Sequence, residues 1–120
     1  MKRITVEEVK AAYAKTGLKP SQSCGSHWAC EGMACGLGAF AAATIEVPQW
    51  NGRALFSWRV PWLAEKLGLQ PSYVYGFSDS FDGDEKTAHD SFIWWDEREY
   101  YQGYLDGQAA AAAVFSEGRA

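Results

Sequence analysis

Four side chains that can bind a metal or carry thiol chemistry lie within twelve consecutive residues of this 120-residue chain. They are Cys24, His27, Cys30 and Cys35, at the spacing C-x2-H-x2-C-x4-C. Thiolates and imidazole are the ligands that zinc prefers, and four of them can complete a tetrahedral structural site. Structural zinc sites usually join two ligand pairs from separate segments, whereas these four groups share one short segment. Zinc binding is therefore the alternative hypothesis, and a chain without a cofactor is the main prediction.

The same segment allows two further interpretations. Cys24 or Cys30 near a helix N-terminus could act as a thiolate, with His27 or His89 as its base, in a thiol redox protein or a hydrolase. The interpretation that we favour is structural, with small cysteines buried in a close-packed helix. On such a helix Cys30 and Cys35 would point about 140° apart, which argues against a shared ion. We therefore assign no catalytic residue.

Two of the predicted helices carry strips of small residues. Gly32 and Gly36 lie four residues apart in a helix predicted over residues 28–44. Gly103 and Gly107 have the same spacing in the predicted last helix, where a run of alanines follows. Such strips let two helix backbones approach closely. We expect these two helices to cross at the centre of the fold, and the alternative is that one strip forms a homodimer interface.

An acidic stretch follows in the second half of the chain. Asp79, Asp82, Asp84 and Glu85 lie within seven residues, and residues 79–99 carry eight acidic side chains against two basic ones. Calcium loops use a different spacing and end on a glutamate that is missing here. The stretch is therefore interpreted as a solvated surface that can meet a basic partner.

Aromatic residues are unusually frequent, with six Trp, six Tyr and six Phe. These are more rings than one small core is expected to bury. The adjacent Trp94 and Trp95 cannot both face the same core, so at least one is expected at the surface or at an interface. We predict a small binding protein, of the adaptor or inhibitor type, whose partner is another protein that contacts residues 79–101. A small-ligand binder with an aromatic pocket is a further alternative.

Charge and hydropathy exclude several classes of protein. The net charge of −4 divides into +3 over residues 1–78 and −7 over residues 79–120, and no basic cluster for a nucleic-acid backbone is present. The apolar run over residues 33–45 is shorter than the roughly 20 residues that span a bilayer. Because no apolar leader follows the basic N-terminus, we expect a soluble, cytoplasmic protein with free cysteines.

Capping and periodicity predict a mainly α single domain of about five helices over residues 1–120, with residues 1–4 and 116–120 frayed. Thr5 and Glu8 have capping-box spacing, and Gly17 is a typical helix stop. Pro61 is expected in the first turn of a helix that ends at Gly68, after a short helical piece. The predicted helices cover residues 5–16, 28–44, about 61–67, 71–83 and 96–115, with extended segments near 73–78 and 91–95 as the alternative.

Four segments together resemble a family of proteins. "AYAKTGLKP", "ACGLGA", "YVYGFSDSFDG" and "GYLDGQAAAAAVF" follow one another in this order. They are similar to segments of small uncharacterised bacterial and phage-associated proteins that share KTGLKP, a Cys-containing LGA, GF-x-x-x-FDG and a final Gly- and Ala-rich helix. The resemblance implies a mostly helical single domain and assigns no site residue.

Overall fold

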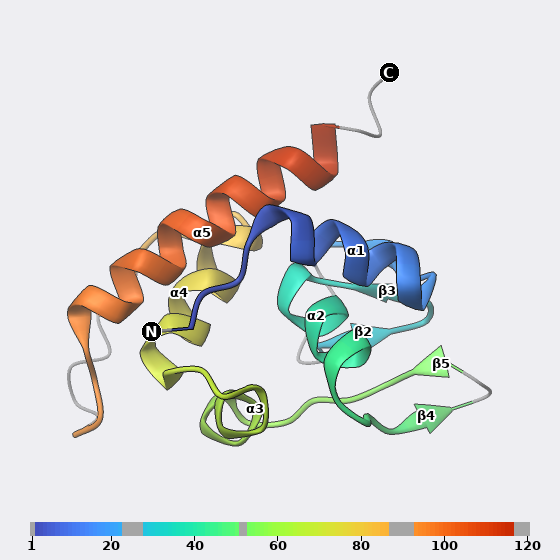
Figure 1. Cartoon of the computed structure of the whole chain (residues 1–120), viewed down its shortest axis with the longest axis horizontal. Coiled ribbons are helices and arrows are strands. Elements are labelled where there is room, and N and C mark those ends of the chain that lie inside the picture. Colours follow the sequence, from blue (N-terminus) through green and yellow to red (C-terminus); the bar gives the residue numbers. More distant parts are fainter. Residues whose placement is uncertain (1, 23–27, 51–52, 87–92, 117–120) are drawn as a thin grey trace.

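The structure, a computed structural model, describes residues 2–22, 28–50, 53–86 and 93–116, and it confirms the mainly α fold (Figure 1). Its elements are α1 (Val6–Thr16), β1 (Lys19–Pro20), β2 (Ala29–Cys30), β3 (Met33–Ala34), α2 (Gly36–Thr44), β4 (Gln49–Trp50), β5 (Arg53–Ala54), α3 (Val60–Leu67), α4 (Pro71–Phe81) and α5 (Glu97–Ser116). Over these described ranges, no helix is long and apolar enough to cross a membrane.

The predicted helix ends are confirmed where local chemistry sets them. In α1 the Thr5 hydroxyl accepts the Glu8 amide at 3.1 Å, and the Glu8 carboxylate accepts the Thr5 amide at 3.0 Å. Gly17 then ends α1 in the left-handed region at a φ of 72°. Pro61 stands in the first turn of α3, which ends at Gly68. The helix over residues 71–83 is confirmed as α4, so residues 73–78 are helical and not extended.

The helix predicted from residue 28 begins only at Gly36. Residues 29–34 form an antiparallel hairpin in which Ala29 pairs with Ala34. Its two turn residues, Glu31 at a φ of 51° and Gly32 at 83°, are both left-handed, as a two-residue turn between twisted strands requires. Gly32 is therefore a turn residue, and its predicted place in a helical packing strip is wrong.

Two small sheets cover one end of the helical core. β3 is the middle strand of the first, parallel to β1 and antiparallel to β2. β4 and β5 form an antiparallel pair, and Phe56 just beyond β5 bridges to Ala29 in β2. The short helical piece predicted before Pro61 is therefore wrong, because this segment is extended and adds to the sheet edge.

α4 and α5 lie so close that their backbones touch (Figure 1). A Cβ atom added at Gly76 of α4 would collide with the carbonyl oxygen of Tyr100. In return, a Cβ atom added at Gly103 of α5 would collide with the carbonyl oxygen of Tyr73. A Cβ atom added at Gly107 would likewise collide with atoms of α4. Two helix backbones can approach this closely only where both helices have glycine at the contact.

The small residues of the last helix therefore pack against α4. The predicted pairing of the two glycine-rich helices is wrong, since α2 packs chiefly on α1. Gly36 in α2 instead faces the rings of Phe77 and Phe81. Because Gly36, Gly103 and Gly107 are buried within one chain, their surfaces are not open to a second copy.

The N-terminal segment is held in place and does not fray over residues 2–4. The Ile4 amide donates to the Tyr73 hydroxyl at 2.8 Å, and this hydroxyl donates to Asp106 at 2.5 Å. Arg3 forms an ion pair with the same carboxylate at 2.7 Å. Burial alone would raise the pKa of Asp106, but hydrogen bonds from Arg3, Tyr73 and Gln102 outweigh it and lower that pKa. The segment thereby ties α1 to α4 and α5.

The contact between α4 and α5 predicts the effect of one methyl group. Gly103→Ala should lower the free energy of unfolding by about 2–3 kcal/mol, because the new Cβ would overlap the Tyr73 carbonyl and force the helices apart. Urea denaturation measures this change. Ala112→Leu adds a larger group to the exposed face of α5 and should leave stability unchanged. Equal effects of the two substitutions would contradict the close contact.

Candidate functional site

Five aromatic rings form a continuous row between α4 and the start of α5, which we call the aromatic row. Tyr75 stacks on Trp94 at 5.9 Å between ring centroids, and Trp94 contacts Trp95 at 6.4 Å. Trp95 contacts Tyr100 at 4.9 Å, and Tyr100 contacts Tyr104 at 6.2 Å. Both tryptophans are half-buried, so the expectation that at least one reaches the surface agrees with their exposure. The three tyrosines were not among the predicted site residues.

The predicted acidic residues divide between two places. The Asp79 carboxylate accepts the Tyr100 hydroxyl at 2.9 Å, which attaches it to the aromatic row. Asp84 and Glu85 are exposed beyond the end of α4, and the Asp84 carbonyl oxygen accepts the Tyr104 hydroxyl at 2.7 Å. The structure therefore brings the Asp79 carboxylate and the Asp84 backbone to the row that contains Trp94 and Trp95, and Glu85 is exposed next to Asp84.

Asp82 is the exception, since its carboxyl group turns toward the interior. Burial, and then the charges of Asp84 and Asp79, raise the pKa of Asp82 to about 7. One of its carboxyl oxygens is buried without a hydrogen-bond partner. Burial raises the pKa values of Tyr13 and Cys35, and the charge of Asp82 adds to both shifts, since the carboxyl lies near α1 and α2. Asp82 is thus not part of the surface around the aromatic row.

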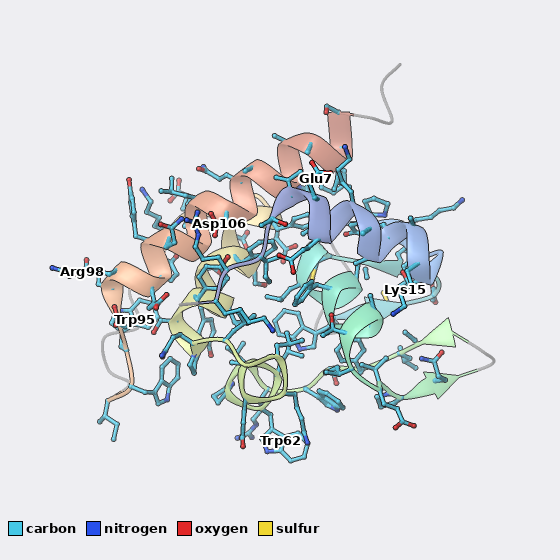
Figure 2. The ribbon with its side chains drawn as sticks, viewed as in Figure 1. Glu7, Lys15, Trp62, Trp95, Arg98 and Asp106 are labelled. Carbon is cyan, nitrogen blue, oxygen red and sulfur yellow. The ribbon has the colours of Figure 1, made fainter. Side chains whose placement is uncertain are left out.

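Exposed apolar groups border the row on the side of α5. Ile93 is fully exposed, and the Tyr101 and Leu105 side chains are each more than two-fifths exposed. Tyr101 also lines a shallow recess of about 400 Å³ with Glu97, Arg98 and Gln102. In Figure 2, Trp95 and Arg98 lie near one another at the N-terminal end of α5, away from the exposed Trp62 of α3. The aromatic row, these exposed apolar groups, the recess and the acidic residues together make up what we call the aromatic and acidic surface. Its members outside the row are Asp79, Asp84, Glu85, Ile93, Glu97, Arg98, Tyr101, Gln102 and Leu105.

The predicted cysteine and histidine cluster is divided by the hairpin. Cys30 in β2 is disulfide-bonded, whereas Cys35 is a free thiol at the N-cap of α2. Cys24 and His27 lie outside the described residues. A disulfide removes the Cys30 sulfur from the thiolates that zinc would need, and it contradicts the expectation that all the cysteines are free. Within the described ranges, no three His, Cys, Asp or Glu side chains are placed to hold a metal ion.

Cys35 has the character of a structural residue. Its sulfur accepts the Gly38 amide at 3.4 Å and so caps the first turn of α2. Burial, and then the charge of Asp82, raise the pKa of the Cys35 thiol to about 12. The thiol is therefore protonated at neutral pH and is not a nucleophile. This agrees with a buried cysteine in close packing, although it stands at a helix cap and not inside a helix.

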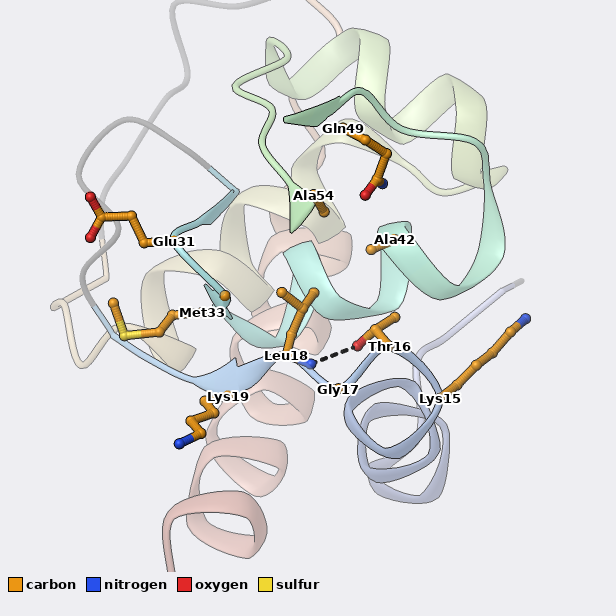
Figure 3. Close-up of a pocket in the computed structure, with 11 residues that line it drawn as sticks. Lys15, Thr16, Gly17, Leu18, Lys19, Glu31, Met33, Ala42, Gln49 and Ala54 are labelled. Carbon is orange, nitrogen blue, oxygen red and sulfur yellow. Dashed lines mark hydrogen bonds between the residues drawn. The ribbon is translucent and has the colours of Figure 1, made fainter. Parts of the chain in front are cut away.

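A cavity of about 750 Å³ lies between the C-terminal end of α1, α2 and the two small sheets (Figure 3). The side chains of Leu18, Ala42 and Ala54 form an apolar floor, and Lys15 and Lys19 extend outward at opposite sides. The Lys15 ammonium group is already bound to the Ala43 carbonyl oxygen at 2.9 Å. None of the eleven lining residues is aromatic, so this cavity is not the aromatic pocket considered from the sequence.

The raised pKa of Asp82 predicts a pH dependence. The unfolded chain releases this proton near pH 4 and the folded chain near pH 7, so the contribution of Asp82 to stability falls as pH rises between these values. In Asp82→Asn the side chain cannot ionise, so this loss of stability at higher pH is absent. The melting temperature of Asp82→Asn relative to wild type should therefore rise by a few degrees from pH 4 to pH 8. Asp84→Asn removes one of the charges that raise this pKa, so its difference from wild type should rise in the same direction but by less. A constant difference in Asp82→Asn would contradict the burial.

The disulfide predicts the number of reactive thiols. The chain has three cysteines, of which Cys30 is disulfide-bonded and Cys35 is free, so not all three can react before reduction. Thiol titration of the denatured, unreduced protein should therefore find fewer thiols than the three found after reduction. Cys35→Ser should lower each value by one. Three thiols before reduction would show that Cys30 is not oxidised.

Comparison with known proteins adds no functional guide. No family model, no curated protein and no solved structure matches this chain. The resemblance to small bacterial and phage-associated proteins remains a prediction, and function has to be argued from the geometry above.

Proposed function

We propose that this chain is a binding protein whose partner, another protein, contacts the aromatic and acidic surface. The observation that carries the proposal is the continuous aromatic row beside exposed Ile93 and Tyr101. Tyrosine and tryptophan dominate the energetically important centres of protein interfaces, since they bury a large area at a small cost in side-chain entropy. Exposed apolar groups next to half-buried rings are a typical starting surface for such a contact.

The charges around the row favour a basic partner. Asp84, Glu85, Asp96 and Glu97 are all exposed near the row, and Arg98 and Lys86 are the only basic residues over 79–86 and 93–104. Complementary charge speeds association and suppresses acidic competitors more than it adds affinity. A second copy of this acidic chain would bring like charges together, so a homodimer through this surface is disfavoured.

The cellular location remains open to test. The cytoplasmic location expected from the sequence implies free cysteines, whereas disulfides persist mainly in oxidising compartments. The oxidised Cys30 therefore weighs toward a location outside the reducing cytoplasm. The thiol count of protein taken directly from its source cells distinguishes the two locations.

The proposal predicts which partners are lost when the surface changes. A Trp94→Ala, Trp95→Ala double variant should recover its protein partner from source-cell extract at least tenfold less well than wild type, measured by quantitative mass spectrometry. Because both rings are half-buried, the exposed pair Asp84→Asn, Glu85→Gln tests the same surface without disturbing packing and should also weaken recovery. Trp62→Ala on α3 is the matched control and should recover the partner fully.

The outcomes separate the alternatives. Recovery that falls in both surface variants and persists in the control supports the proposed surface. Equal recovery by all four proteins contradicts it. Loss in the Trp62→Ala control alone would place the binding surface on α3 and would also contradict it.

A further inference from the structure

A lysine of the chain itself already lies on the tyrosine rings at the edge of the aromatic and acidic surface. The Lys86 ammonium nitrogen lies 4.8 Å from the ring centroid of Tyr101 and 5.3 Å from that of Tyr104. These two rings project from α5 three residues apart, and so they share one face of the helix. A cation within about 6 Å of a ring face is attracted by the electron-rich ring. The rings of Tyr101 and Tyr104 therefore form a binding site for one cation, which we call the seat.

The seat is held in shape by its surroundings. The Tyr104 hydroxyl donates to the Asp84 carbonyl oxygen, which fixes this ring against the segment that carries Lys86. Tyr101 is 48% exposed, and so its ring can be reached from solvent. Glu97 lines the recess beside Tyr101, one helical turn earlier on α5. A cation on the Tyr101 ring would thus have a carboxylate within the same recess.

From this arrangement we infer that the surface recognises an arginine or lysine side chain of a basic peptide segment, and that Lys86 is the internal occupant which this side chain displaces. The inference rests on the proposed function, and it names the chemistry of the partner. A guanidinium group suits the seat best, because its plane can lie on a ring while its edge donates to a carboxylate such as Glu97.

Displacement is possible because the internal contact is local and weak. Lys86 is exposed and lies just past the end of α4, and so it can leave the rings without disturbing a helix. A cation over an exposed ring contributes only modestly, so a partner arginine that adds a carboxylate contact can replace it. The positive charge of Lys86 also lowers the affinity of the partner-free surface for other cations. It therefore favours a ligand with several basic groups over a single ion.

The test measures binding of a fluorescein-labelled, capped hexa-arginine peptide by fluorescence anisotropy at low salt. Lys86→Ala vacates the seat and should bind this peptide roughly two- to fivefold more tightly than Arg98→Ala does. Arg98→Ala is the matched control, because it removes one positive charge from the same surface but leaves Lys86 on the rings. Adding Tyr101→Leu to Lys86→Ala should abolish the extra affinity.

Two results would overturn the inference. One is an equal gain in Lys86→Ala and Arg98→Ala, which would mean that only net charge matters. The other is a gain in Lys86→Ala that survives Tyr101→Leu. Either result leaves the proposed function standing if the tryptophan and acidic variants still lose their protein partner. Retention of that partner by those variants would overturn the proposed function itself.

Discussion

The contact between the backbones of α4 and α5 is the constraint on which the other features of this molecule depend. Gly76 and Gly103 each face a carbonyl oxygen of the opposite helix, so neither position has room for a side chain. With the helices this close, the Tyr73 hydroxyl reaches Asp106 and the Tyr100 hydroxyl reaches Asp79. The first of these hydrogen bonds holds the N-terminal segment, and the second fixes the aromatic row. The core and the candidate site are thus consequences of one helix pairing, and the site is built on rigid elements.

The sequence predicted those features whose chemistry is local. A capping box, a proline in a first turn and a glycine stop act within a few residues, so α1, α3 and α4 could be located closely. The hairpin over residues 29–34 was missed because its strands are two residues long and contain no β-branched or aromatic residue. Its turn also uses Glu31 in a left-handed conformation that few sequences would suggest. The partner of the Gly103 strip was missed for a different reason, since small residues show that something approaches closely but not which element does.

Acidic residues that look alike in the sequence have different roles in the structure. Asp106 is bound by Arg3 and Tyr73 and holds the N-terminal segment against α4 and α5. Glu99 is buried, and burial raises its pKa, whereas Asp84 and Glu85 are exposed. The net charge of the second half of the chain therefore overstates the charge that a partner would meet. Only tertiary contacts can make this distinction, because each carboxylate has the same local sequence signal.

The aromatic and acidic surface has both a structural and a recognition part, and burial separates them. Tyr100 is buried against α4, so its loss would disturb the packing of the two helices as much as any contact with a partner. Tyr101, on the next position of the same helix, has turned by about 100° toward solvent and touches Lys86 instead. A helix can therefore present one tyrosine to the core and its neighbour to a ligand. The close pairing of α4 and α5 then fixes the backbone that carries the exposed ring, which lowers the entropy that is lost when a cation binds to it.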